Sequence, residues 1–344
     1  MSKYQEFVDG VDAPLWPITV FVGLVVLVVL PLFGVGTFWL RIMIGIFMWI
    51  GLAQSWNIIG GYAGYLDFGH GAYFGIGAFV TGILMVHYSM SFLSGLLLAG
   101  LFVAIVSYVI GLPTLRLTGA YFAIATWALA EATRQLTLVL EITGGTAGMS
   151  LPTGLDAYGI PLPTVPRIWV IYYTMLVLGG GTVLITYILL ERMEFGYRVK
   201  AVRDDDDAAE SVGINTNRVK RQVYVLSCVP AGLLGGAYAY FITFIHPHEV
   251  LAALITAQMV VMVLVGGLGT VWGPVVGGAF LFLLNRMSAV YLGTDTVYIA
   301  MIGVLIMIVV LFAPNGIHGI VRGDISTQDV RQNYRSIRDK FNIY

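Results

Sequence analysis

Long apolar runs separated by short polar connections fill most of the chain, and this pattern predicts a bundle of membrane-spanning helices. A helix needs about 20 apolar residues to cross the hydrocarbon core of a bilayer. The runs are continuously apolar instead of alternating residue by residue, which favours helices over the strands of a membrane barrel. Ten runs are present: 17–38, 39–59, 68–86, 92–114, 119–140, 168–190, 222–245, 252–265, 273–292 and 295–313.

Two of these segments are weak candidates for spanning helices. Run 252–265 is short, and the stretch 60–80 is interrupted by seven glycines. We therefore expect an all-α, polytopic transmembrane bundle of eight to ten spans. The stretches 59–79 and 264–281 each contain a Gly-Gly pair, a break and then small residues. This similarity predicts either an internal repeat with a transport path between the halves, or simply close helix packing through glycine.

Composition supports the membrane assignment. Of 344 residues, 58% are hydrophobic and 11% are charged, with a mean hydropathy of +0.86. Soluble domains carry about 25% charged residues, because their surfaces face water. The net charge of -1 gives no indication of a nucleic-acid partner. The expected environment is the lipid bilayer of the cell (inner or plasma) membrane.

The distribution of positive charge predicts the orientation. Twelve of the 18 lysines and arginines lie in the segment 191–221 or after residue 320. Basic loops stay on the cytoplasmic side, so we expect a cytoplasmic segment 1–16, a transmembrane domain 17–320 with a cytoplasmic loop 191–221, and a cytoplasmic tail 321–344. The first apolar run is long enough to be retained as a span. The segment 141–167 then lies outside.

Signs of chemistry on this chain are few. No GxxxxGK[ST] phosphate loop occurs, so ATP hydrolysis would have to take place on another chain. We find no Ser/His/Asp or paired-carboxylate arrangement, and expect neither enzymatic activity nor a metal or cofactor. Cys228 is expected to be an inert packing residue, and His246 and His248 to form a loop end on a helix.

Charged residues inside a membrane are costly and need partners or water. Asp67 and His70 fall in the glycine-broken stretch, where they either line a path or serve a helix of residues 71–86 that Asp67 caps. Glu131 and Arg134 share a helix face. They predict a clamp to a neighbouring helix, with a polar wall along the path as the alternative. These residues supply no continuous proton relay, so proton coupling is disfavoured.

The stretch 194–221, EFGYRVKAVRDDDDAAESVGINTNRVKRQ, is the most informative part of the chain. Acidic residues favour a helix start and glycine favours its end, so we expect a short helix at about 206–212 that Gly213 terminates. Its position between two spans indicates a docking helix for a soluble partner, although an ordinary solvated loop has the same composition.

Several motifs together resemble the permease subunits of ATP-binding-cassette importers for branched-chain amino acids, and specifically their LivM-like member. They occur in the order of that family and cover nearly the whole chain after residue 45. The motifs are GLAQSWNIIGGYAGYLDFGHGAYFGIGAF (51–79), RLTGAYFAIATWALAEATRQL (116–136), TGGTAGM (143–149), GYRVKAVRDDDDAAESVGIN (196–215), VLSCVPAGLLGGAYA (225–239), VMVLVGGLGTVWGPVVGGAF (261–280) and FAPNGIHGI (312–320).

The resemblance implies a set of partners and an ATPase-coupling loop. The partners would be a second related permease, two ATP-binding subunits that hold ATP and Mg, and an extracytoplasmic substrate-binding protein. The acidic start of the loop departs from the mixed residues usual in the family. The implied coupling residues are Asp204, Asp205, Asp206, Asp207, Ala208, Ala209, Glu210, Gly213 and Ile214.

The substrate implied by the resemblance is a branched-chain or similar small amino acid. Relatives with the same motif order handle urea, short amides or small carboxylates, and these stay as alternatives. A stand-alone secondary carrier is the remaining alternative, because the residues alone leave sodium coupling open.

Overall fold

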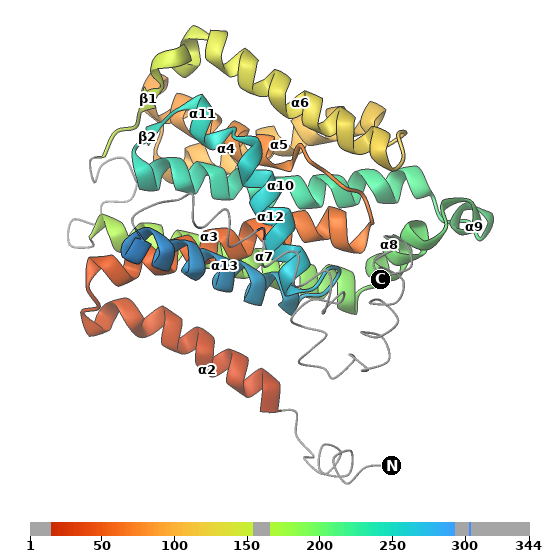
Figure 1. The fold of residues 1–344 in the computed structure, drawn as a ribbon, viewed down its shortest axis with the longest axis horizontal. Coiled ribbons are helices and arrows are strands. Elements are labelled where there is room, and N and C mark those ends of the chain that lie inside the picture. Colours follow the sequence, from red (N-terminus) through yellow and green to blue (C-terminus); the bar gives the residue numbers. More distant parts are fainter. Residues whose placement is uncertain (1–14, 154–165, 293–302, 304–344) are drawn as a thin grey trace, which may run out of the picture.

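The protein is a helical bundle, as the apolar pattern predicts (Figure 1). The computed structural model describes residues 15–153, 166–292 and 303. The longer helices are α2 (Leu15–Val29), α3 (Thr37–Asn57), α4 (His70–His87), α5 (Phe92–Thr114), α6 (Ala120–Val139), α7 (Arg167–Thr186), α8 (Glu194–Asp204), α10 (Thr216–Ile242), α12 (Ala253–Gly266) and α13 (Trp272–Leu292). The shorter elements are η1 (Leu30–Phe33), η2 (Ile58–Tyr62), η3 (Glu141–Thr143), η4 (Gly145–Ala147), β1 (Met149–Ser150), η6 (Tyr187–Arg192), α9 (Asp206–Ser211), β2 (Phe244–Ile245) and α11 (Pro247–Val250).

Nine of the ten predicted runs coincide with a helix, which confirms the fold class. The tenth, 295–313, lies outside the described residues except for Gly303, as do most of the segment 1–16 and all of the tail 321–344. Six helical segments of the described chain are long and apolar enough to cross a membrane: Thr37–Tyr62, His70–His87, Phe92–Thr114, Arg167–Arg192, Thr216–Ile242 and Pro247–Gly266. The chain is therefore a multi-pass membrane protein.

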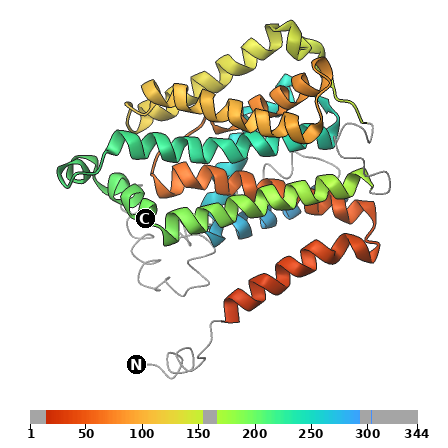
Figure 2. The ribbon, with the colours of Figure 1, turned by 180° about the vertical axis from the view of Figure 1, so that it is seen from behind.

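Different elements lie at the two ends of the bundle. Figure 1 shows α8 and α9 at one end, and the two-stranded β1–β2 ribbon with α11 at the opposite end. Figure 2 shows the same separation from behind, with α2 diverging from the other helices at the edge of the bundle. The segment 191–221 and the start of 141–167 thus lie at opposite ends of the bundle.

Close packing of α4 against α10 forms the centre of the bundle, and glycine makes it possible. A Cβ atom on Gly77 would lie 1.9 Å from the carbonyl oxygen of Gly232, and one on Gly235 would lie 1.9 Å from that of Phe74. Backbones of membrane helices can approach so closely only where a small residue faces the neighbour. Several of the glycines in this crossing therefore serve packing.

Both glycine-rich stretches break the helical path. After α3 the chain continues through the π-helical turn η2 and then runs without helix over 63–69, where Gly64 has a φ of +77°. The second break follows α12 and spans 267–271, with Gly269 at a φ of +69°. Glycine adopts such positive φ angles without the steric cost that other residues bear. The short run 252–265 gains length from α11, which directly precedes it.

Candidate functional site

The segment 191–221, which the sequence predicts to be cytoplasmic, is mostly helical. It contains α8, α9 and the first turns of α10, which begins at Thr216 instead of the predicted 222. Asn215 explains the earlier start, because its side chain accepts a hydrogen bond from the Arg218 amide (3.0 Å) and caps α10. Helix α8 was not expected from the sequence.

Helix α9 occupies 206–211, close to the predicted 206–212, and Gly213 follows it with a φ of +88°. Asp205 caps the helix, since its Oδ1 accepts a hydrogen bond from the Ala208 amide (3.0 Å). Asp206 instead forms an ion pair with Lys220 of α10, whose side chain is only 7% exposed. The acidic residues therefore have different local roles, and one of them ties α9 to a spanning helix.

Helix α8 contacts η2, where the first broken segment begins. The Arg203 guanidinium donates a hydrogen bond from Nη1 to the Gly61 carbonyl oxygen (2.8 Å). A second connection passes through Glu191, which accepts from the Tyr62 hydroxyl (2.7 Å) and from Lys200 Nζ (3.3 Å). Both connections end on η2, so the segment 191–221 is joined to the point where the path of α3 is interrupted.

The two broken segments also contact each other. Asn57, a fully buried residue at the end of α3, donates from Nδ2 to the Thr270 carbonyl oxygen (2.8 Å). Its Oδ1 accepts a hydrogen bond from the Gly269 amide (2.9 Å). One side chain thus satisfies two backbone groups of a segment more than 200 positions away, which fixes the two breaks side by side.

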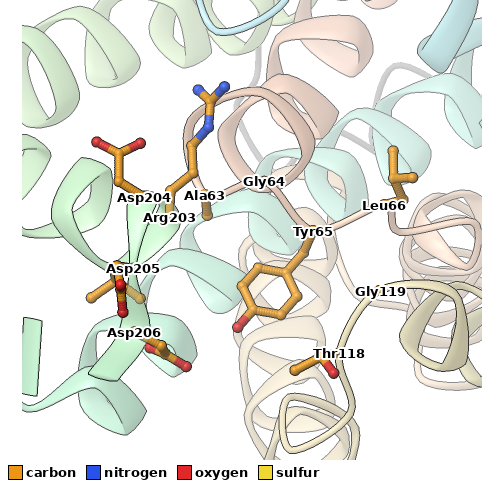
Figure 3. A pocket seen from close by; sticks show the side chains of 11 residues that line it. Ala63, Gly64, Tyr65, Leu66, Thr118, Gly119, Arg203, Asp204, Asp205 and Asp206 are labelled. Carbon is orange, nitrogen blue, oxygen red and sulfur yellow. The ribbon is translucent and has the colours of Figure 1, made fainter. Parts of the chain in front are cut away.

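A cavity of about 260 Å³ opens where residues 63–66, 118–119 and 202–206 meet (Figure 3). Figure 3 shows Arg203 and the acidic side chains on one side of it, and Tyr65 and Thr118 on the other. The lining residues are Ala63, Gly64, Tyr65, Leu66, Thr118, Gly119, Val202, Arg203, Asp204, Asp205 and Asp206. The first broken segment and the residues that join α8 to α9 therefore form walls of one cavity.

The segment between η2 and α4 is held by a buried polar network. Asp67 and His70 are both fully buried, with 3.2 Å between Asp67 Oδ2 and His70 Nδ1. Asp67 Oδ1 accepts from the Gly69 amide (2.8 Å), and its carbonyl oxygen accepts from the Trp56 indole (2.8 Å). Asp67 does not cap the first turn of α4 as one interpretation expected, because its carboxylate pairs with His70.

Ser55 completes this network, and it corrects the expectation that no Ser/His/Asp arrangement exists. Its Oγ lies 3.1 Å from His70 Nε2. The Ser55 hydroxyl donates to the Leu52 carbonyl oxygen (2.8 Å), so towards His70 it acts as an acceptor. All three side chains are fully buried. A nucleophile needs a free hydroxyl and access to a substrate, so this arrangement holds the backbone together.

With these elements placed, the chain can be compared with known proteins. The family model of the branched-chain amino acid transport system permease component matches residues 38–311. The chain belongs to this family. It is a permease subunit of an ATP-binding-cassette importer. No solved structure matches the chain.

Curated relatives of the permease agree with the family. It is 28% identical to the high-affinity branched-chain amino acid transport system permease protein LivM of Escherichia coli (strain K12), over 83% of this chain and 70% of the relative. It is 29% identical to LivM of Salmonella typhimurium, over 81% of this chain and 69% of the relative. The LivH protein of Salmonella typhimurium is 24% identical to the permease, over 78% of this chain and 90% of the relative. The likeness to LivM was predicted from the motifs.

The predicted Glu131–Arg134 pair lies in α6, next to α11. Arg134 donates to both carboxylate oxygens, from Nε (2.9 Å) and from Nη2 (2.5 Å). Its Nη1 lies 2.6 Å from Nδ1 of His248 in α11. These contacts connect α6 to α11, which supports the clamp interpretation. His246 and His248 form the start of α11, as expected for a loop end on a helix.

Cys228 is a buried free cysteine inside α10. Among the described residues, no group of three or more His, Cys, Asp or Glu side chains could hold a metal ion.

The sequence interpretation missed Ser55, Asn57, Arg203 and Lys220. For three of them, a feature of the sequence could have indicated their importance. Ser55 and Asn57 are polar residues inside a predicted span, where polar side chains need a specific partner. Lys220 lies five residues after Asn215, the cap of α10, so it belongs to that helix once the true start of the helix is known.

Proposed function

We propose that the permease forms half of the translocation path for branched-chain amino acids in the cell (inner or plasma) membrane. A second related permease would supply the other half, and two ATP-binding subunits would bind ATP and Mg and drive transport. An extracytoplasmic binding protein would deliver the substrate. The observation that carries the proposal is the family match over residues 38–311. The relatives named LivM and LivH are transport permeases of branched-chain amino acids.

The segment 204–214 is proposed as the site that couples the ATP-binding subunits to the membrane domain. Asp204 at the end of α8, and Asp207, Ala208 and Glu210 at the surface of α9, would face the partner. Ala209 is buried beneath α9. Val212 adds an apolar side chain that is 77% exposed. Such a mixed charged and apolar surface suits a polar protein interface with an apolar contact at its centre.

The proposed mechanism is alternating access. Closure of the ATP-binding subunits would move α9, and the ion pair between Asp206 and Lys220 would pass that movement to α10. An energy source can shift the permease between states only by interacting differently with each of them. The free energy would come from ATP on the partner subunits, and this chain would perform no catalytic step.

Uptake by whole cells tests the substrate. A strain that lacks this permease is compared with the same strain carrying a plasmid copy, using labelled leucine, urea and a short amide. We expect the strain that lacks the permease to lose leucine uptake, and the plasmid copy to restore it. Restored uptake of urea or the amide without leucine would contradict the branched-chain assignment, and would favour the related importers of those compounds.

A further inference from the structure

Helix α8 lies just before α9, the proposed coupling helix. The two contacts that α8 makes with the breaks both end on η2. Arg203 reaches the Gly61 carbonyl oxygen (2.8 Å), and Lys200 reaches Tyr62 through Glu191. Neither contact belongs to α9, which is tied to α10 by the pair between Asp206 and Lys220.

The neighbourhood of Arg203 joins both broken segments. A Cβ atom on Gly269 would lie 3.4 Å from Arg203 Nη1 and 3.1 Å from the Gly61 carbonyl oxygen. A Cβ atom on Gly61 would lie 2.6 Å from the Gly269 amide nitrogen. The guanidinium therefore sits directly at the junction of the breaks, where glycine lets the two backbones touch.

Asn57 makes this junction a single unit. It donates to Thr270 and accepts from Gly269 while it remains attached to α3. A displacement of Gly61 therefore acts on the second break through these two buried hydrogen bonds, because an unpaired buried backbone group is costly. The second break leads directly into α13.

We infer that Arg203 and Lys200 are positioning residues that transmit movement of the cytoplasmic loop to both broken segments, with Asn57 holding the segments together. The inference rests on the proposed function in one respect, namely that partner ATPases move this loop. It adds that α8, and not α9 alone, carries the movement. The hinge would be η2, since a π-helical turn weakens the regular bonding of a helix and is frequent at functional sites.

The test uses the complete transporter in proteoliposomes and measures leucine molecules imported per ATP hydrolysed. Arg203→Ala should lower this ratio about threefold to tenfold, the size expected for residues along a coupling network. Arg203→Lys should lower it less, because lysine keeps a donor. Arg198→Ala is the matched control, since the Arg198 side chain is 56% exposed and pairs with Glu194 of the same helix.

A purely structural role would reduce uptake and hydrolysis together and leave the ratio unchanged. An assembled Arg203→Ala complex with the wild-type ratio would overturn the inference. If that variant does not assemble, Lys200→Ala decides by the same criterion. A wild-type complex without ATP-driven leucine uptake would contradict the proposed function, which keeps the two failures distinct.

A spectroscopic measurement adds a readout independent of turnover. Leu268 in the second break is 41% exposed and can carry a spin label as Leu268→Cys in a Cys228→Ala background. ATP binding by the partner subunits should change the label mobility when Arg203 is present. The change should be lost with Arg203→Ala and kept with Arg198→Ala. An unchanged response in Arg203→Ala would also overturn the inference.

Discussion

Asn57 accepts a hydrogen bond from the Gly269 amide (2.9 Å) across 212 positions of the chain. This contact brings the two glycine-broken segments together, and Arg203 of the segment 191–221 reaches the same junction. The elements that the sequence singled out separately, two breaks and one charged loop, are thus parts of one structure at one end of the bundle.

Removal of the Asn57 side chain should destabilise the permease. Asn57→Ala leaves the Gly269 amide and the Thr270 carbonyl without their partner, and a buried polar group without a partner costs about 1–3 kcal/mol. We expect a lower melting midpoint in detergent. Asn217→Ala is the control, because Asn217 is exposed on α10 and such substitutions stay within about 0.5 kcal/mol. Equal melting of both variants would contradict the role of Asn57.

A larger side chain in the crossing of α4 and α10 should destabilise the permease. Gly77→Ala places a methyl group against the Gly232 carbonyl oxygen, where 1.9 Å is available. Overpacking of this kind costs about 1–3 kcal/mol or more, so less folded protein should be recovered after extraction. Gly181→Ala on α7 has nothing within 4 Å of the new Cβ and should be neutral or stabilising. Similar yields of the two variants would show that the crossing is looser than described.

The buried Asp67–His70 pair should contribute to folding and not to chemistry. Asp67→Ala leaves His70 and the Gly69 amide without their acceptor, and breaking a buried pair costs about 3–5 kcal/mol. Asp67→Asn should cost less, because its amide oxygen can still accept from Gly69. Ser55→Ala should leave leucine uptake per folded molecule unchanged. Loss of uptake in a normally folded Ser55→Ala permease would show that Ser55 acts in transport.

The acidic residues of the loop should separate into structural and exposed groups. Asp205→Ala removes the cap of α9 at a cost of about 1 kcal/mol, and Asp206→Ala leaves the buried Lys220 without its ion pair. Both should increase protease cleavage within the loop. Asp207→Ala should leave cleavage unchanged while it weakens binding of the ATP-binding subunits at low salt. Identical cleavage of all three variants would contradict this division.

Local patterns predicted the parts of the fold that depend on local physics. Continuous apolar runs located nine helices, and the acidic start with Gly213 located α9 to within one residue at its end. They did not predict that Asn57 bonds to Gly269, or that Lys220 is buried. Those contacts depend on how distant helices pack, and no period or spacing in one sequence records that. Ser55 was missed as a partner of His70 for the same reason.

ATP dependence of transport tests the central claim most directly. The permease, a second permease and two ATP-binding subunits are reconstituted in proteoliposomes, with the substrate-binding protein outside and ATP enclosed. We predict that labelled leucine accumulates with ATP and does not accumulate with a non-hydrolysable analogue. A matched complex that lacks residues 204–214 should lose uptake. Leucine accumulation by this permease alone, without ATP-binding subunits, would contradict the account and indicate a secondary carrier.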